Sequence, residues 1–441
     1  MKPSRSLLWV LSLGVAAVGI KNFEPGLAID APFYASVGRN LAISSDWFYL
    51  SAGIPELTPF TDHPPFGMWL LGLVFKILPA EDWSARLLTE VFYVLFLWML
   101  FHFVQKNSGE KIAVWTIILL WSWSRFSNFF ANVYLDPGAL LFGMAALVTW
   151  KRSPLLSGFL FSLAILYKGL AVAGFLIPIG LFALEKPRVK DISLFVLGVS
   201  LPLIVFTLAV FQSSVPDYWQ RYWNLQMGKK LAPKWSGPTL LSGHFWWLLW
   251  RDTNYFLPLV LFSLRKKDLK IPLATGATFL FLIAQSGLVG NQYWLYVMPW
   301  LAWLIAAGVF VRIPMREERL VGATAFIAIA AALIIQYLPI RIHAYPPTDI
   351  ELALRWDLTD QKRISYVVID SGTDFIITSR LAWYGKTEIR PNPVSNQIPG
   401  VSKEFALLQY SEHPDRAKAI SQTSWTLHGR YHGGHTLWLS P

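Results

Sequence analysis

Long apolar runs constrain this chain more than any other feature. About eleven of them are long enough, with their flanking residues, to cross the roughly 30 Å apolar core of a bilayer as helices. The chain has 441 residues, of which 54% are hydrophobic and only 15% charged. That balance is typical of a polytopic membrane protein rather than a soluble domain. The runs lie at residues 6–20, 87–105, 111–130, 138–150, 154–167, 170–184, 191–212, 242–263, 271–289, 293–311 and 319–339.

The basic residues predict the orientation of these helices. The net charge of +11 comes from short clusters between apolar runs, which argues against a nucleic-acid surface and follows the positive-inside rule. All the clusters fall on one side, predicted to be cytoplasmic, if residues 66–79 do not cross the membrane. We therefore expect residues 32–43 and 66–79 to be helices at the outer interface, within one long first loop. The clusters are Lys106 with Lys111, Lys151 with Arg152, and residues 186–190, 265–270 and 312–319.

The composition changes near residue 341, where charged residues become common. We expect a helix at 374–384 and strands at 364–370, 387–390, 405–409 and 436–439. The predicted fold is an α-helical polytopic membrane domain over residues 1–340, followed by a small extracytoplasmic α/β domain over 341–441. The chain has no cysteine, which excludes disulfides, thiolate metal sites and cysteine nucleophiles.

Asp30 follows the first apolar run and precedes the first interfacial helix, which also carries Tyr34. One interpretation makes Asp30 a helix N-cap, because Asp is favoured there and Pro32 suits a first turn. The other makes it a general base at the bilayer edge, able to take a proton from an acceptor hydroxyl.

Asp62 and His63 stand before two prolines, in the same outer loop. They form either an Asx turn with an exposed histidine or a phosphate-binding element. In the second case His63 would bind the phosphate as a cation or hydrogen-bond donor, and Asp62 directly or through a divalent cation. These two residues are the only candidate metal ligands, and no cofactor is certain.

Asp136 and Lys168 are predicted to reach the same outer face. Asp136 precedes a proline, which favours a helix start, yet its location also fits a catalytic acid. Lys168, with Gly169, is either a plain hairpin tip or an anion ligand. A lysine on the outer side runs against the positive-inside bias, which favours the anion ligand.

Two further outer segments carry candidate substrate contacts. Most aromatic residues of the loop at 216–234 are typical of a membrane-interface belt, although Arg221 within it could reach a phosphate. Tyr296 lies in the stretch from Gln292 to Pro299, which is either a hydrated helix start or a donor contact.

The order of these features resembles a known group of enzymes. The segments IDAPFYASVGRNLAISSDWF (29–48), FTDHPPFGMWLLGLVFKILPAEDWSARLL (60–88) and YLDPGALLFGMAAL (134–147), followed by Lys168-Gly169, resemble the protein mannosyltransferases and ArnT-like transferases of the GT-C superfamily. The resemblance covers most of the membrane part. The chain departs from the group's pattern at Ala31, where a second acid is usual, and at Gln292, where a basic residue is usual.

The resemblance implies residue roles. The first-loop acid, here Asp30, is the proposed catalytic base, with Asp136 as the second-loop acid. Asp62 and His63 are implied to bind near the lipid phosphate. Such an enzyme takes its sugar from a polyprenyl phosphate, a good leaving group that needs only cationic or hydrogen-bonding support.

We therefore expect an inverting glycosyltransferase at the outer face of a bacterial inner membrane. Its partners would be a lipid-linked sugar donor, a lipid, glycan or protein acceptor, and membrane lipids, without nucleic acid. The alternatives are a transferase or polymerase of lipid-linked oligosaccharides, and a lipid or glycan transporter. A transporter would bury its ionisable residues near mid-span, whereas the candidates here lie at outer ends.

Overall fold

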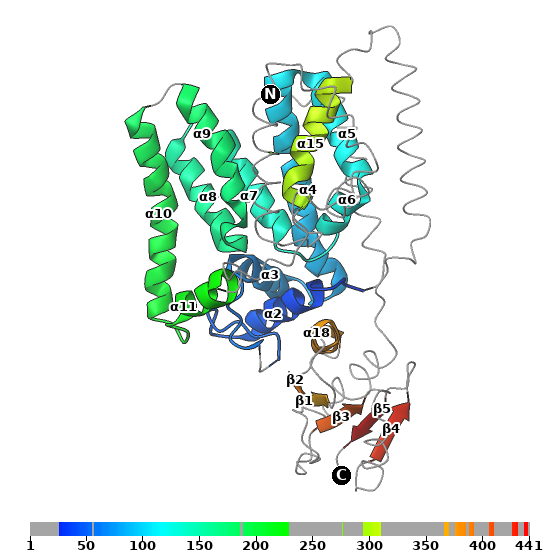
Figure 1. Ribbon diagram of the computed structural model, residues 1–441. Coiled ribbons are helices and arrows are strands. Elements are labelled where there is room, and N and C mark those ends of the chain that lie inside the picture. Colours follow the sequence, from blue (N-terminus) through cyan, green and yellow to red (C-terminus); the bar gives the residue numbers. More distant parts are fainter. Residues whose placement is uncertain are drawn as a thin grey trace. The chain divides into compact units, whose positions relative to one another are not determined.

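The computed structural model describes residues 26–54, 57–185, 188–228, 276 and 294–309, and in the C-terminal part 366–369, 375–384, 388–391, 405–409, 426–430 and 436–439. These residues form two compact units. Unit 1 holds residues 61–67 and the described residues from 86 to 309. Unit 2 holds the described residues from 26 to 60, residues 68–85 and the C-terminal elements. Figure 1 labels the helices and strands of both.

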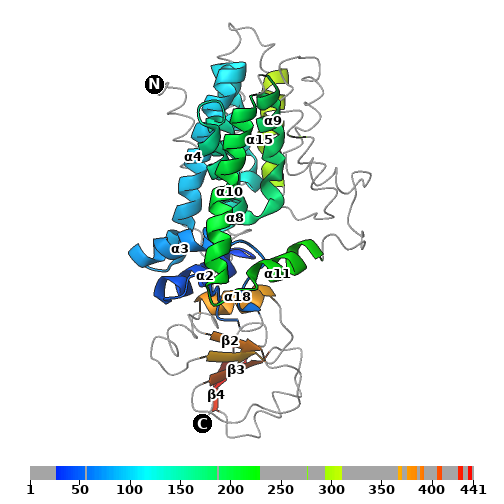
Figure 2. The same ribbon diagram turned by 90° about the vertical axis from the view of Figure 1, so that its left-hand side faces the viewer.

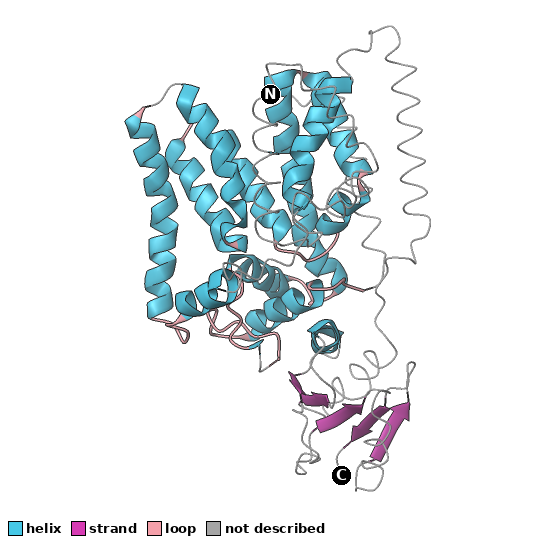
Figure 3. Cartoon of the chain, in the orientation of Figure 1, coloured by secondary structure: helices cyan, strands magenta, loops and turns pink. Residues whose placement is uncertain are grey.

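Unit 1 is built entirely of helices within its described residues (Figure 3). Apolar side chains such as Phe126, Leu140 and Trp300 form its core. The helices are α4 (Asp82–Ser108, which begins in unit 2), α5 (Glu110–Ser122), α6 (Ser124–Phe130), α7 (Asp136–Thr149), α8 (Pro154–Lys168), the 3-10 segment η3 (Leu170–Phe175), α9 (Leu176–Glu185), α10 (Val189–Phe211), α11 (Tyr218–Tyr222), the π-helical segment η4 (Trp223–Gly228) and α15 (Trp294–Val309).

Small residues set the contact between helices α8 and α10 of unit 1, which lie side by side in Figures 1 and 2. A Cβ atom on Gly158 would meet the backbone of Phe195, and one on Gly198 would meet the backbone of Leu155. Glycines at a crossing let two backbones approach closely, as in the helix pairs of membrane proteins. This contact fixes α10 against α8, the helix that ends in Lys168.

Two helices among the described residues, α4 and α10, are long and apolar enough to cross a membrane. On α10 large apolar side chains are exposed along much of the length, including Val196, Leu201 and Phe211. Such a surface is costly in water and suits contact with lipid tails. The described part of the chain therefore supports the predicted membrane location.

The predicted apolar runs correspond to helices with some changes. Residues 111–130 form two helices, because the backbone at Trp123 is extended (φ −84°, ψ 103°) and separates α5 from α6. Residues 170–184 begin as the 3-10 segment η3 before α9. Apart from residue 276, the predicted spans at 6–20, 242–263, 271–289 and 319–339 lie outside the described residues, so the count of eleven stays a prediction.

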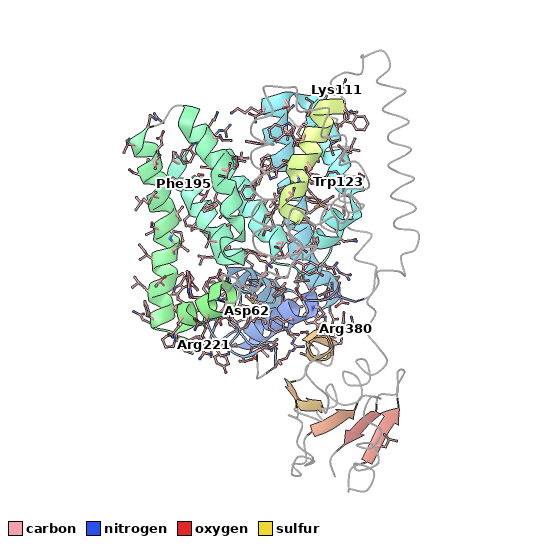
Figure 4. All side chains as sticks on the ribbon, in the orientation of Figure 1. Asp62, Lys111, Trp123, Phe195, Arg221 and Arg380 are labelled. Carbon is pink, nitrogen blue, oxygen red and sulfur yellow. The ribbon has the colours of Figure 1, made fainter. Side chains whose placement is uncertain are left out.

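The ends of unit 1 are chemically distinct. In Figure 4, Lys111 at the start of α5 and Asp62 lie at opposite ends of the helices. The start of α10, next in sequence to the basic residues at 186–190, lies at the same end of the helices as Lys111. Helix α11 lies at the opposite end (Figure 1). Within unit 1, this polarity agrees with the predicted separation of basic clusters from the candidate site.

Unit 2 contains the two predicted interfacial helices, α2 (Ala31–Ile43) and most of α3 (Phe66–Ile77). They pack closely, because a Cβ atom on Gly38 would collide with the side chain of Leu71. The ammonium group of Lys76 in α3 lies 4.7 Å from the ring centre of Trp47, a cation–π contact that accounts for a lysine in this apolar helix.

The C-terminal part of unit 2 forms a five-stranded sheet of order β2-β1-β3-β5-β4. Strand β1 pairs in parallel with β2 on one side and with β3 on the other, and α18 (Phe375–Tyr384) lies between β1 and β2 in the chain. Strands β3, β5 and β4 pair antiparallel. Each predicted tail element has a counterpart, and among the described strands β4 was not predicted. The strands are β1 (Tyr366–Ile369), β2 (Glu388–Pro391), β3 (Phe405–Gln409), β4 (Thr426–Arg430) and β5 (Thr436–Leu439). The division at residue 340 stays a prediction.

Candidate functional site

Three helices of unit 1 bring a carboxylate, an amine and a phenol together. Lys168 Nζ, at the end of α8, lies 3.1 Å from Asp136 Oδ2 at the start of α7. The hydroxyl of Tyr296 in α15 donates a hydrogen bond to Asp136 Oδ1 at 3.2 Å. Asp136 is fully buried, and Lys168 and Tyr296 nearly so. We call these three residues the Asp136 cluster.

The helix ends favour the charges of this cluster. A carboxylate in the first turn of a helix and a cation in the last turn both complement the helix dipole. Asp136 is the first residue of α7, as predicted from the proline that follows it, and Leu135 takes the N-cap position. Among the described residues Oδ2 makes no hydrogen bond of good geometry, so its partner is the charge of Lys168.

Tyr167 precedes Lys168 in α8 and packs the chain segments next to the cluster. Its ring packs against Phe66 and Phe92, and is nearly inaccessible to solvent. A Cβ atom on Gly67 or on Gly138 would collide with this ring. Gly67 and Gly138 therefore let the segments that carry Asp62 and Asp136 pack against the ring of Tyr167.

Asp62 and His63 are only partly buried, in a segment held by α11. The hydroxyl of Tyr218 donates a hydrogen bond to the backbone oxygen of His63 at 2.7 Å. Burial, and then the neighbouring Tyr222 and Asp62, raise the pKa of Tyr218 well above its ordinary value. The phenol therefore remains a donor at neutral pH, and it fixes the backbone of the predicted phosphate-binding element.

Tyr222, one turn after Tyr218, reaches the end of α8. Gly169 has φ of 85°, and a Cβ atom there would collide with the Tyr222 hydroxyl. Helix α11 thus contacts both the Asp62 segment and the residue after Lys168. We expected the aromatic residues of this loop to be interface-belt residues; Trp223 is exposed, but Tyr218 and Tyr222 are buried. The spacing of four residues between Tyr218 and Tyr222 was the sequence signal from which their burial could have been predicted.

Arg221 points away from this arrangement. Its Nε lies 2.7 Å from Asp217 Oδ2, and both side chains are nearly half exposed, at 47% and 45%. Figure 4 shows Arg221 on α11. Within the described residues the structure pairs Arg221 with a neighbour on the same surface, and its predicted contact with a phosphate stays a prediction.

Asp30 lies in unit 2, at the N-cap position of α2, and is partly exposed. Its side chain makes no capping hydrogen bond, although the position is the one that the N-cap interpretation requires. Ile29 before it has φ of 50°, a conformation that β-branched residues rarely adopt. Tyr34, one turn into α2, is buried, and its ring packs against those of Phe33 and Phe60.

The possible metal ligands are few. No group of three or more acidic or histidine side chains gathers within the described part of the chain. A cation at Asp62 and His63 therefore stays a prediction.

Comparison with known proteins identifies the architecture. Residues 62–213 match the family model of the dolichyl-phosphate-mannose-protein mannosyltransferases, a stretch that holds Asp62, His63, Asp136 and Lys168. The crystal structure of ArnT from Cupriavidus metallidurans bound to undecaprenyl phosphate matches at a TM-score of 0.72 and 13% identity. That match covers 98% of this chain and 97% of the other. The chain has the GT-C fold of ArnT.

Other comparisons are weaker. ArnT in the apo state matches at a TM-score of 0.68 and 14% identity, over 98% of this chain and 97% of that one. The Archaeoglobus fulgidus oligosaccharyltransferase matches at 0.53 and 12% identity, over 98% of this chain and 73% of the other. No curated protein matches the sequence. The GT-C resemblance predicted from sequence is therefore confirmed for the fold.

Proposed function

We propose that this chain is an inverting glycosyltransferase that takes a sugar from a polyprenyl-phosphate donor. The acceptor is a lipid, glycan or protein at the outer face of a bacterial inner membrane. The observation that carries the proposal is the end-to-end match to ArnT, a protein whose crystal structure contains undecaprenyl phosphate. The family-model match over residues 62–213 supports the same class of reaction.

The reaction needs few protein groups. The acceptor oxygen or nitrogen attacks the anomeric carbon, and the bond from that carbon to the phosphate oxygen breaks. Asp30 takes the acceptor's proton, and the polyprenyl phosphate leaves with the bonding electron pair. Attack opposite the leaving group inverts the configuration through an oxocarbenium-like transition state.

The leaving phosphate gains negative charge, which His63 and Lys168 are suited to stabilise. Asp136 and Tyr296 fix the ammonium group of Lys168 at the end of α8. Tyr218 likewise fixes the backbone at His63. Preorganised donors of this kind need no rearrangement as charge develops. In this proposal Asp136 holds Lys168 in position, and its earlier assignment as a catalytic acid becomes an indirect role.

A transferase or polymerase of lipid-linked oligosaccharides is the second candidate. It is favoured by the match to the archaeal oligosaccharyltransferase over 98% of this chain. A transporter is less well supported, because the ionisable cluster lies at the start of α7 and the end of α8 rather than at mid-helix.

The decisive experiment compares the lipids and envelope glycans of a deletion strain with those of the complemented strain by mass spectrometry. A single sugar missing from one glycan would identify donor and acceptor, which purified protein would then convert in vitro. Loss of a whole oligosaccharide would favour the second candidate. Unchanged glycans together with altered lipid distribution would favour a transporter.

Sidedness can be tested because the chain contains no cysteine. Lys151, between α7 and α8, and Gln212, after α10, are both exposed. We expect an impermeant maleimide added outside the inner membrane to label Gln212→Cys but not Lys151→Cys. Labelling of both from one side would contradict the predicted topology.

A further inference from the structure

The backbone just before Asp30 is bound by a side chain from the C-terminal part of unit 2. The amide of Leu27 donates to the hydroxyl of Tyr384 at 2.6 Å. Arg380 donates to the backbone oxygen of Leu27 at 3.3 Å. Leu27 itself is fully buried, and Tyr384 and Arg380 nearly so. Both polar groups of this residue are therefore bound by α18.

Asp82, the first residue of α4, joins this network. Its Oδ2 accepts hydrogen bonds from the Gly26 amide at 3.1 Å and from the Tyr384 hydroxyl at 3.3 Å. Its Oδ1 accepts one from Trp383 Nε1 at 2.8 Å. Hydrogen bonds to an ionised carboxylate are about twice as strong as neutral ones. We call Asp82, Arg380, Trp383 and Tyr384 the Asp82 clamp.

Arg39 ties the clamp to the helix that follows Asp30. Its guanidinium donates to the backbone oxygens of Ala382 and Trp383, at 3.0 and 3.1 Å, which binds the last carbonyls of α18. Burial lowers the pKa of Arg39 to about 10, so the group stays charged at neutral pH. Helix α18 is thus attached to α2 as well as to residues 26 and 27.

A strained residue lies in the turn just before Asp30. Ile29 has φ of 50°, a strained conformation that persists only where the surroundings impose it. The Asp30 side chain makes no capping hydrogen bond. Within the turn the Ala31 amide donates to the Ala28 oxygen at 2.9 Å, and the segment just before the turn is fixed by the bonds of residues 26 and 27.

We propose that the Asp82 clamp positions Asp30 for catalysis, which gives the C-terminal domain a role in the reaction. Tyr384 and Asp82 are positioning residues that act through the backbone of residues 26–29. The inference rests on the proposed function, in which Asp30 is the base. A displaced base loses rate steeply, because an error of about 1 Å can cost about 100-fold.

The test removes one hydroxyl. Tyr384→Phe keeps the ring and deletes the bonds to the Leu27 amide and to Asp82. We expect kcat to fall about tenfold while the donor KM changes little, because the base is displaced but the phosphate contacts are not. Tyr49→Phe is the matched control, since Tyr49 is an exposed tyrosine of the same unit. We expect it to keep wild-type kcat.

A double-mutant cycle separates positioning from general destabilisation. In an Asp30→Asn background, Tyr384→Phe should cause no further loss of the residual rate, because it acts through Asp30. A tenfold loss in that background, or an unchanged kcat in the single variant, would overturn the inference. Asp82→Asn is a second variant, and we expect the same pattern from it.

Hydrogen–deuterium exchange tests the clamp without any activity assay. In Tyr384→Phe, the amides of residues 26 and 27 should exchange at least several-fold faster, while those of α7 keep their rates. Unchanged exchange at these amides would refute the clamp. A wild-type protein that transfers no sugar would instead refute the proposed function, and the exchange result would still decide whether the clamp exists.

Discussion

Asp136 and Asp30 both stand at the start of a helix, yet they lie in opposite surroundings. Asp136 is fully buried and bound to Lys168 and Tyr296 by its own carboxylate. Asp30 is partly exposed and makes no capping bond, and the backbone at Leu27, three residues earlier, is bound by α18. The first acid is bound to partners in the core, whereas the second is partly exposed, which suits the proposed proton transfer. Two acids that look equivalent in sequence therefore suit different roles.

The largest expected effect on this contrast comes from Asp30→Asn. Losing a general base should lower kcat about 100- to 10,000-fold, with unchanged thermal stability of the detergent-purified protein. Asp217→Asn is the control, because Asp217 is an acid in an exposed ion pair. Transfer at the wild-type rate by Asp30→Asn would remove Asp30 from the reaction.

Breaking the Asp136 cluster should act on stability first. Asp136→Leu leaves the Lys168 charge buried, so we expect a loss of about 3–5 kcal/mol, measured as a lower unfolding temperature. Adding Lys168→Met should restore most of that stability, because a buried pair can be replaced by apolar residues. If the double variant also recovered sugar transfer, Lys168 would have no role at the phosphate.

Gly169→Ala probes how α11 meets the end of α8. The alanine would have to adopt the residue's φ of 85°, and its Cβ atom would displace Tyr222. We therefore expect the free energy of unfolding to fall by about 1–3 kcal/mol. Gly180→Ala is the matched control. It lies in α9, and a Cβ there meets nothing among the described residues, so the variant should be neutral or slightly more stable. Equal unfolding temperatures for both variants would contradict the close contact.

Arg221→Ala should have the smallest effect. Exposed ion pairs contribute about 0–1 kcal/mol, so the unfolding temperature should hardly change. Steady-state kinetics with the lipid donor should also remain close to wild type. A raised donor KM at unchanged stability would indicate that Arg221 contacts the donor phosphate. It would also weaken the contrast between buried and exposed charged residues.

Local pattern determined much of the chain. The lengths of apolar runs predicted the helices of unit 1, because a helix in lipid must satisfy its backbone internally and therefore shows as a continuous apolar stretch. Apolar runs bounded by turn residues predicted most of the tail elements as well. The break at Trp123 was not predictable, since the apolar sequence continues through it.

The relations among distant residues needed the tertiary structure. Asp136 and Tyr296 are 160 positions apart, and Leu27 and Tyr384 are 357 apart. No local propensity specifies such pairs, because they follow from which helix faces meet once the chain is packed. The sequence alone determined that this protein carries acids and a lysine at one end of a set of apolar helices. Only the packing decided that Asp136 forms an ion pair with Lys168, while the backbone just before the turn at Asp30 is bound by α18.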